Sequence, residues 1–110
     1  MTADTSTDPI VVIATATPLP GKTDEVIAGL RDLIPVVHDE PGCILYTLNR
    51  AENGDVVFIE KWASQADSDH HGATSSIMPT LIANVSPLLV GPPVVVTHRS
   101  IPLGGPKGAL

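Results

Sequence analysis

The stretch Gly54–His71, GDVVFIEKWASQADSDHH, changes its periodicity halfway and predicts a strand that runs directly into a helix. From Val56 to Trp62, successive residues alternate between two faces in the manner of a β-strand. Ser64 is then placed to cap the N-terminus of a helix. The only Trp and the only Phe of the chain lie on this stretch together with two adjacent histidines. A functional site is therefore expected at this strand-to-helix junction.

The composition indicates one globular domain that acts on neither nucleic acid nor membranes. The chain has 110 residues, of which 43% are hydrophobic and 16% charged, enough for a single core of modest size. A net charge of -6 and an aromatic content of 3% disfavour binding to phosphate backbones, stacked bases or anionic lipids. Cys43 is the only cysteine, so no intrachain disulfide is possible. The chain shows neither a secretory signal nor an apolar run of about 20 residues, and we expect a cytoplasmic protein.

The residues before this stretch predict a strand, a helix and a second strand. Ile10–Leu19 is rich in β-branched residues and ends among prolines, which is typical of a strand. In Lys22–Asp39 the apolar residues recur at helical spacing, and Pro35 predicts a kink or loosened end of this one helix. Cys43–Arg50 alternates as a strand. The Asn-Gly pair at residues 53–54 then predicts a hairpin between this strand and the next.

The residues after it predict a second helical region and a last strand. A helix begins near Gln65, and a further helical segment with one apolar face covers Ile77–Leu89. Val94–Ile101 follows a Gly-Pro-Pro stop and predicts the fourth strand. We expect residues 1–8 to be a disordered tail, 9–101 to form the domain and 102–110 to be a flexible tail or an exchanged arm.

The order β-α-β-β-α-β predicts an α+β fold of the ferredoxin-like type. Such a domain has a four-stranded antiparallel sheet with both helices on one face, which leaves the other face uncovered. The first and last strands contain the continuous apolar runs VVIA and VVV. Because that open face is too hydrophobic for water, we expect a homodimer in which two sheets pack together.

Five segments in this order resemble the antibiotic biosynthesis monooxygenase family of dimeric α+β barrels. The similarity extends roughly over residues 10–99, and its segments are IVVIATATPLPGK, HDEPGCILYTL, VFIEKW, His71 and LLVGPPVV. The resemblance implies a homodimer whose subunits each hold a pocket between the sheet and the helices. It further implies a monooxygenase that oxidises phenols or quinols with molecular oxygen and needs no metal, flavin or heme. In such a reaction the protein removes a phenolic proton, orients the resulting anion and excludes water.

The resemblance assigns catalytic roles to two residues and points to others around them. Trp62 matches the family's Trp at the end of the third strand, where it lines the pocket or serves as a core residue. His71 matches the helix histidine, which acts as a base, as a hydrogen-bond partner or, without a role, as a surface residue. Tyr46 is either a hydrogen-bond donor to the substrate or a structural residue. Glu60 shares the face of Trp62; when buried it has a raised pKa, and on the surface it forms a salt bridge.

The remaining predicted contacts with the substrate are apolar. Phe58 lies on the face of Glu60 and Trp62. After His71 the family often continues with aromatic residues, whereas this chain reads GATSSIMPTL. The pocket is therefore expected to be lined by three apolar side chains of the next helical segment. These apolar candidates are Phe58, Ile77, Met78 and Leu81.

Two other kinds of site are disfavoured. The related heme-degrading enzymes use an Asn on the first strand, where this chain has Ala14. Asp67, His70 and His71 form a poor metal site, because adjacent histidines on a helix do not readily face one ion, and His70 is expected in solvent.

Two further functions stay open beside the monooxygenase. One is an isomerase or degradative enzyme for a small oxygenated metabolite, and the other is a dimer that binds a small molecule without catalysis. No G-x-S-x-G, G-x-G-x-x-G or Walker sequence occurs, so neither a serine hydrolase nor a nucleotide cofactor is expected.

Overall fold

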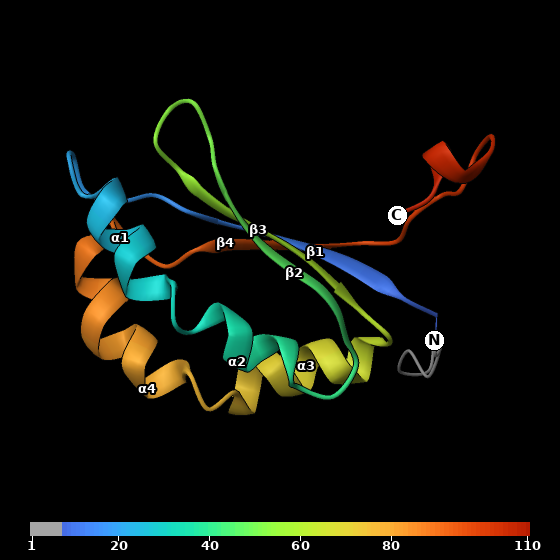
Figure 1. Ribbon diagram of the computed structural model, residues 1–110, viewed down its shortest axis with the longest axis horizontal. Helices are drawn as coiled ribbons and strands as arrows, with labels where there is room; N and C mark the ends of the chain where they lie inside the picture. The colour runs from blue at the N-terminus through green and yellow to red at the C-terminus, as the bar shows by residue number, and fades with distance from the viewer. Residues whose placement is uncertain (1–7) are drawn as a thin grey trace.

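A four-stranded antiparallel sheet in the order β2-β3-β1-β4 forms one layer of the computed structural model, which describes residues 8–110. Its strands are β1 (Ile10–Ala16), β2 (Cys43–Arg50), β3 (Val56–Trp62) and β4 (Val94–His98). The helices are α1 (Thr23–Leu30), α2 (Ile34–His38), α3 (Gln65–Thr74) and α4 (Met78–Thr80). Shorter helical turns are η1 (Leu81–Val85), η2 (Ser86–Leu88) and η3 (Pro106–Gly108). Helices α1 to α4 lie on one side of the sheet (Figure 1), and the predicted ferredoxin-like α+β fold is confirmed.

The strand register places two rows of side chains on the helical side of the sheet. Tyr46 lies opposite Glu60, which in turn lies opposite Val12. In the next row, Phe58 lies between Leu48 and Ala14. Residues paired across antiparallel strands share one face, so these rows form the floor on which the helices pack.

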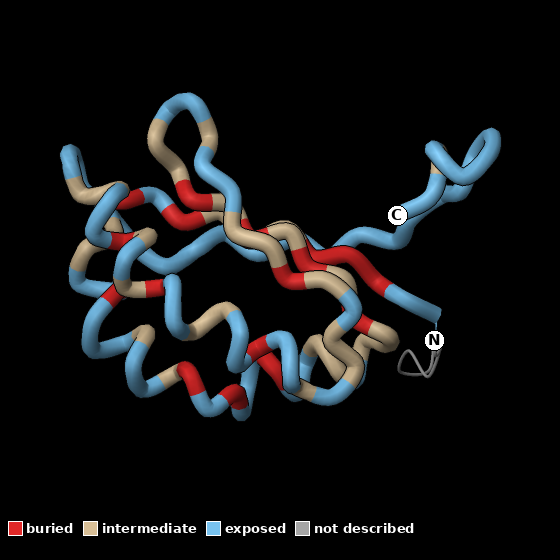
Figure 2. Tube along the Cα trace, viewed as in Figure 1, coloured by how far each residue is buried: buried red, intermediate tan, exposed pale blue. Residues whose placement is uncertain are grey.

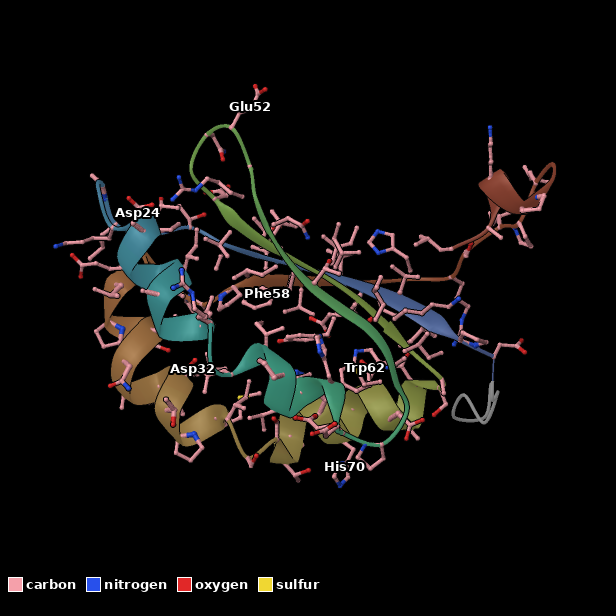
Figure 3. All side chains as sticks on the ribbon, viewed as in Figure 1. Asp24, Asp32, Glu52, Phe58, Trp62 and His70 are labelled. Atoms are coloured by element: carbon pink, nitrogen blue, oxygen red, sulfur yellow. The ribbon has the colours of Figure 1, made fainter. Side chains whose placement is uncertain are left out.

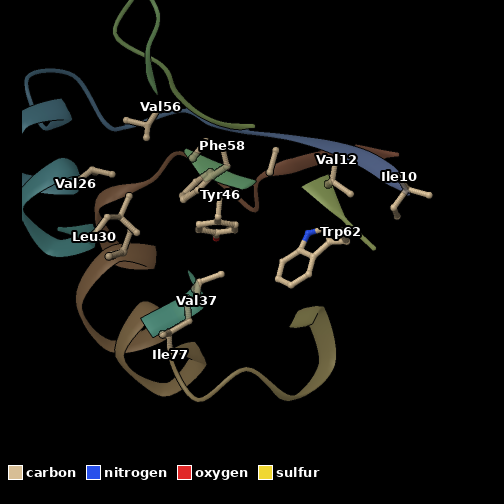
Figure 4. Close-up of a cluster of buried hydrophobic side chains, with 13 residues drawn as sticks. Ile10, Val12, Val26, Leu30, Val37, Tyr46, Val56, Phe58, Trp62 and Ile77 are labelled. Carbon is tan, nitrogen blue, oxygen red and sulfur yellow. The ribbon is translucent and has the colours of Figure 1, made fainter. Parts of the chain in front are cut away.

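The core lies between this floor and the helices (Figure 4). Its largest fully buried side chains are Trp62, Ile10, Leu30, Val26, Val37 and Val56. Buried residues concentrate on β1, on β3 and on the helical surfaces turned toward the sheet, whereas β4 is exposed along its length (Figure 2).

The single kinked helix predicted for Lys22–Asp39 is wrong, since α1 and α2 are separate. The amide of Leu33 bonds to the carbonyl of Leu30 at 3.0 Å, which tightens the chain into a turn after α1. Pro35 has no amide hydrogen and lies in the first turn of α2, where that hydrogen would have no helical partner. The proline therefore starts a new helix, which the prediction had excluded.

Other boundaries also differ from the prediction. The first strand ends at Ala16, and Pro18 beyond it forms only an isolated bridge with Leu89. The last strand ends at His98 instead of Ile101. The predicted helical segment 77–89 is divided into α4, the π-helical η1 and the 3-10 turn η2. All but the last residue of the predicted N-terminal tail lies outside the described residues.

The start of α3 follows the prediction. Ser64 is extended, and its side chain accepts a hydrogen bond from the amide of Asp67 at 3.2 Å. The serine thus caps the helix that carries His71, as expected from the sequence.

The sheet face away from the helices carries apolar side chains. Ile13 lies between Ile59 and Val96 in the register, and all three share this face. Val94 and Val96 are 65% and 47% exposed. Beyond β4, residues 99–110 leave the body of the domain (Figure 1), and the side chain of Lys61 donates a hydrogen bond to the carbonyl of Leu110. Among the described residues no helix is both long and apolar enough to cross a membrane.

Candidate functional site

A carboxylate from a loop holds His71 at the inner side of α3. The Nδ1 atom of His71 lies 2.7 Å from Oε1 of Glu40, and the side chains of this pair are 10% and 15% exposed. The hydroxyl of Ser75, at the C-terminal end of α3, donates to the other Glu40 oxygen at 2.5 Å. Both oxygens of Glu40 are therefore bonded to groups of one helix.

Aromatic rings surround His71 on the sheet side. Its ring stacks on Trp62, with centroids 4.8 Å apart and an interplanar angle of 29°. Tyr46 meets His71 edge to face, with centroids 5.4 Å apart and an angle of 66°. The indole nitrogen of Trp62 donates to Oε1 of Glu60 at 2.9 Å. The imidazole is thus fixed between a carboxylate, an indole and a phenol.

A cavity of about 350 Å³ opens beside this cluster, between the sheet and the helices. Most of its walls are apolar. The polar side chains that line it are Tyr46, Glu60, Ser68, His71 and Ser86. The apolar walls include Phe58, Leu30, Met78, Leu81, Val85 and Val95. The cavity is therefore largely apolar, and Tyr46, Glu60 and His71 form a polar group on its wall.

The polar atoms of the cavity wall that have no hydrogen-bond partner include three on the side chains beside the aromatic cluster. Within residues 8–110, every buried side-chain nitrogen and oxygen has a hydrogen-bond partner. No bond is made by Nε2 of His71, the hydroxyl of Tyr46 or the second oxygen of Glu60, so these atoms are accessible. Because all three residues line the cavity, we infer that these atoms are open to it.

Burial sets the protonation of two of these groups. It raises the pKa of Glu60 above its ordinary value of 4.5, and the negative charge of Glu40 raises it further. The bond from Trp62 and the charge of His71 oppose this effect. Burial and then the charges of Glu60 and Glu40 also raise the pKa of Tyr46, so its hydroxyl stays protonated and acts as a donor.

The structure brings most of the predicted site residues together. His71, Tyr46, Glu60, Phe58, Met78 and Leu81 all line the cavity. Trp62 and Ile77 are buried at 0% and 3% exposure, but they are core residues behind the cavity wall. In Figure 3, Trp62 and Phe58 lie between the sheet and the helices, whereas His70 projects from the outer side of α3. The ring of His70 is exposed beside Thr74.

Two residues of the site were not anticipated from the sequence. Glu40 lies in the loop between α2 and β2, 31 positions before His71, and Ser75 follows α3. The available signal was the Glu-Pro-Gly motif, which lies in the segment HDEPGCILYTL that resembles the family but was given no role in the site. Among the described residues, no group of three or more His, Cys, Asp or Glu side chains is placed to hold a metal ion.

Comparison with known sequences identifies a family. The model of the family described as antibiotic biosynthesis monooxygenase matches residues 9–77, more than half of the chain. Uncharacterized protein sll1783 of Synechocystis sp. (strain ATCC 27184 / PCC 6803 / Kazusa) is 36% identical over 69 residues, which are 61% of this chain and 47% of that protein. The match thus spans about half the length of this curated relative.

Solved structures of the same fold cover nearly all of the domain. A Caulobacter crescentus CB15 protein that carries the name of the same family is 31% identical, with a TM-score of 0.74 over 86% of this chain and 92% of its own. SO0527 from Shewanella oneidensis is 35% identical, with a TM-score of 0.72 over 84% of this chain and 91% of its own. For Rv0793 from Mycobacterium tuberculosis the identity is 28% and the TM-score 0.71, over 86% and 96% of the two chains.

Proposed function

The chain belongs to the antibiotic biosynthesis monooxygenase family, and from this membership we propose that it oxidises an uncharged phenol or quinol with O2 and without a cofactor. The observation that carries the proposal is the apolar cavity of about 350 Å³ on which Nε2 of His71 opens. A base with a free lone pair at the wall of a largely apolar pocket is the arrangement that proton removal from a phenol requires.

The lining of the cavity favours a neutral, flat molecule. Its volume lies at the lower end of the usual range of roughly 300–1,000 Å³ for small-molecule sites. Among the described residues, no Lys or Arg lines this cavity, whereas Glu60 does. A carboxylate or phosphate on the substrate would therefore meet no positive partner except a protonated His71. Phe58 and Leu30 supply the flat apolar contacts that an aromatic ring needs.

Three of the polar side chains have a task in the proposed reaction. His71 accepts the phenolic proton on Nε2, and the electron pair of the broken O–H bond stays on the substrate. The hydroxyl of Tyr46 donates to an oxygen of the bound substrate and orients it, since its raised pKa keeps it protonated. Glu60 accepts the Trp62 bond and holds that wall of the pocket in place.

The anion then reacts with oxygen, and no titratable group other than His71 takes part. One electron passes from the anion to O2, and the resulting radical pair combines in the pocket to form a carbon–oxygen bond. The peroxide oxygen then takes the proton back from Nε2 of His71, which gives the hydroperoxide and restores the base. Where the reacting carbon is a CH2 group, as in an anthrone, loss of water from the hydroperoxide gives a quinone. One O2 is consumed and one H2O released per substrate.

We further propose that the domain works as a homodimer joined through the open face of the sheet. The apolar row of Ile59, Ile13 and Val96 on that face supports this assembly.

Oxygen uptake by the chelator-treated protein tests the proposed function. A panel of hydroxyanthrones, quinols and catechols would be supplied, with quinone formation followed in parallel. We expect uptake with at least one substrate, and a loss of roughly 100- to 10,000-fold in His71→Ala. His70→Ala is the matched control, because this neighbouring histidine is exposed and outside the cavity, and it should keep full activity.

Two results would contradict the proposal. Turnover of a substrate in the absence of oxygen would indicate an isomerase or a degradative enzyme instead. Binding of the panel without any product would indicate a binding protein.

A further inference from the structure

Glu40 and Ser75 determine which nitrogen of His71 carries the proton. An ionised carboxylate only accepts hydrogen bonds, so the 2.7 Å contact requires that Nδ1 of His71 be the donor. A neutral imidazole has one N–H group, and with that proton on Nδ1 the lone pair lies on Nε2. Nε2 is the ring nitrogen that is accessible from the cavity.

The loop that carries Glu40 is fixed at several points. The amide of Glu40 bonds to the carbonyl of Val37 at 3.0 Å, and the amide of Cys43 bonds to the carbonyl of Glu40 at 3.2 Å. Two residues after Glu40, the carbonyl of Gly42 accepts from the amide of Ala63 at 2.8 Å. Glu40 therefore projects from a rigid turn and cannot follow a movement of His71 at low cost.

Ser75 fixes the carboxylate itself. Its hydroxyl donates to Oε2 at 2.5 Å, so the two oxygens of Glu40 are directed to two different side chains of the same helix. With Oε2 held, Oε1 has one orientation toward the imidazole. A free carboxylate would rotate and lose part of this direction.

We propose that Glu40, oriented by Ser75, is a positioning residue that holds His71 in the Nδ1–H form and thereby makes Nε2 the base toward the cavity. This role rests on the proposed function of His71 as the proton acceptor. In the step itself the substrate O–H bond breaks, its electron pair remains on the substrate oxygen, and a new N–H bond forms at Nε2. The imidazolium that results is stabilised by the negative charge of Glu40.

The tautomer of His71 is measurable without any substrate. Nitrogen-15 NMR of the full chain, at a pH where the imidazole is neutral, distinguishes Nδ1–H from Nε2–H. We expect Nδ1–H in the wild type. In Glu40→Gln the amide can donate to Nδ1 instead of accepting from it, and Nε2–H should become populated. Glu40→Asp retains the acceptor and should preserve Nδ1–H, and Ser75→Ala should give a mixture.

Activity provides the second readout. In Glu40→Gln, kcat for the oxidation of the best phenol in the panel should fall on the order of 100-fold, the scale of a misplaced catalytic group, with KM little changed. Glu40→Asp should recover part of that loss. Glu52→Gln, on the exposed hairpin turn, is the control for loss of one negative charge and should change neither readout.

An Nε2–H tautomer in the wild type, or an unchanged tautomer in Glu40→Gln, would overturn the assignment. A changed tautomer with unchanged kcat would overturn the positioning role. If the wild type oxidises none of the panel, the proposed function fails, and the NMR spectra still decide the tautomer. Should Glu40→Gln prove unfolded by circular dichroism, Ser75→Ala and Glu40→Asp decide between the same outcomes.

Discussion

Burial governs the protonation of two side chains of the site, and a hydrogen bond governs the orientation of a third. Tyr46 and Glu60 lie opposite each other on neighbouring strands and are each 5% exposed. Burial raises the pKa of both, which keeps the phenol protonated and favours the neutral form of the carboxyl. His71 is the residue whose ring is held by a partner on one nitrogen and accessible on the other. At the scale of residues, the proposed reaction uses these side chains as a donor, a buried acid that holds the pocket wall, and a base.

Tyr46→Phe tests the donor. The ring packs between Phe58 and His71, and these contacts remain in the variant, so the fold should be retained. Loss of one hydrogen bond to the substrate should cost about 1 kcal/mol, or roughly a fivefold decrease in kcat/KM. Steady-state kinetics would measure it, and an unchanged kcat/KM would show that the hydroxyl does not contact the substrate.

Glu60→Gln tests the buried acid through the pH dependence of stability. Since the pKa of Glu60 is higher in the folded state, its contribution to stability is fully present below about 4.5 and is lost as pH rises through the raised value. Gln still accepts the bond from Trp62 and does not titrate. Relative to wild type, the variant should therefore gain stability across this window, by at most about 1.4 kcal/mol per pH unit.

Urea denaturation of both proteins over a series of pH values would measure this difference. Glu52→Gln, on the exposed turn between β2 and β3, serves as the control variant. A difference between wild type and Glu60→Gln that stays constant with pH would contradict the raised pKa.

Several of the site residues that were predicted share one continuous stretch, whereas Tyr46, Met78 and Leu81 lie outside it. Trp62, Glu60 and His71 were anticipated because strand periodicity and a cap place them at one junction. Glu40 was not, because its contact with His71 joins residues 31 positions apart and depends on the packing of a loop. Nothing in local periodicity reports such a contact.

At the scale of elements, the Glu-Pro-Gly loop and the start of α3 form one unit. Gly42 has a φ of +77°, and a Cβ at this position would lie 2.2 Å from the carboxyl group of Asp67. Asp67 in turn accepts a hydrogen bond from the cap residue Ser64 at 2.9 Å. The absence of a side chain at Gly42 therefore lets the loop approach the helix, and this approach brings Glu40 to His71.

Gly42→Ala tests that unit, with Gly21→Ala as a matched control. Both glycines have a φ of +77°, but an added Cβ at Gly21 meets nothing within 4 Å. Gly21→Ala should cost only the conformational term of about 1–2 kcal/mol. Gly42→Ala should cost clearly more and should also reduce oxidation of the phenol. Equal thermal stability of the two variants would contradict the close packing of loop and helix.

Two irregularities of the elements could not be derived from periodicity. The register of β2 shifts between Cys43 and Leu45, so Cys43 lies opposite Trp62 while Ile44 is 53% exposed. Simple alternation along Cys43–Arg50 would place Ile44, two positions before Tyr46, on the same face as Tyr46. Pro35 likewise is compatible with a kink or with a new helix, and only the tight turn before it decides between them. The places of the four strands along the chain, by contrast, follow from alternation, β-branched composition and turn residues.

At the scale of the whole molecule, one layer of helices covers one face of the sheet, and the cavity lies between the two layers. The opposite face is available for a second copy. The order of elements was enough to predict this architecture, because the ferredoxin-like arrangement leaves one face of its sheet free.

Sedimentation velocity at micromolar concentration tests the assembly. We expect a homodimer in the wild type and a monomer in Val96→Lys, which places a charge within the apolar row beside Ile13. Val36→Lys is the control, because this residue on α2 is similarly exposed, at 43%, but lies on the helical side. A monomeric wild-type protein would contradict the predicted dimer.

The most direct test of the central claim, that His71 ionises a phenol in this cavity, is the absorption spectrum of a bound hydroxyanthrone under anaerobic conditions. Phenolates absorb at longer wavelength than phenols, and oxidation cannot proceed without O2. At a pH where the free compound is protonated, the wild-type protein should generate the spectrum of the anion, and His71→Ala should bind the compound without it. An anion of equal intensity with His71→Ala, or a bound phenol that stays protonated in the wild type, would contradict the account.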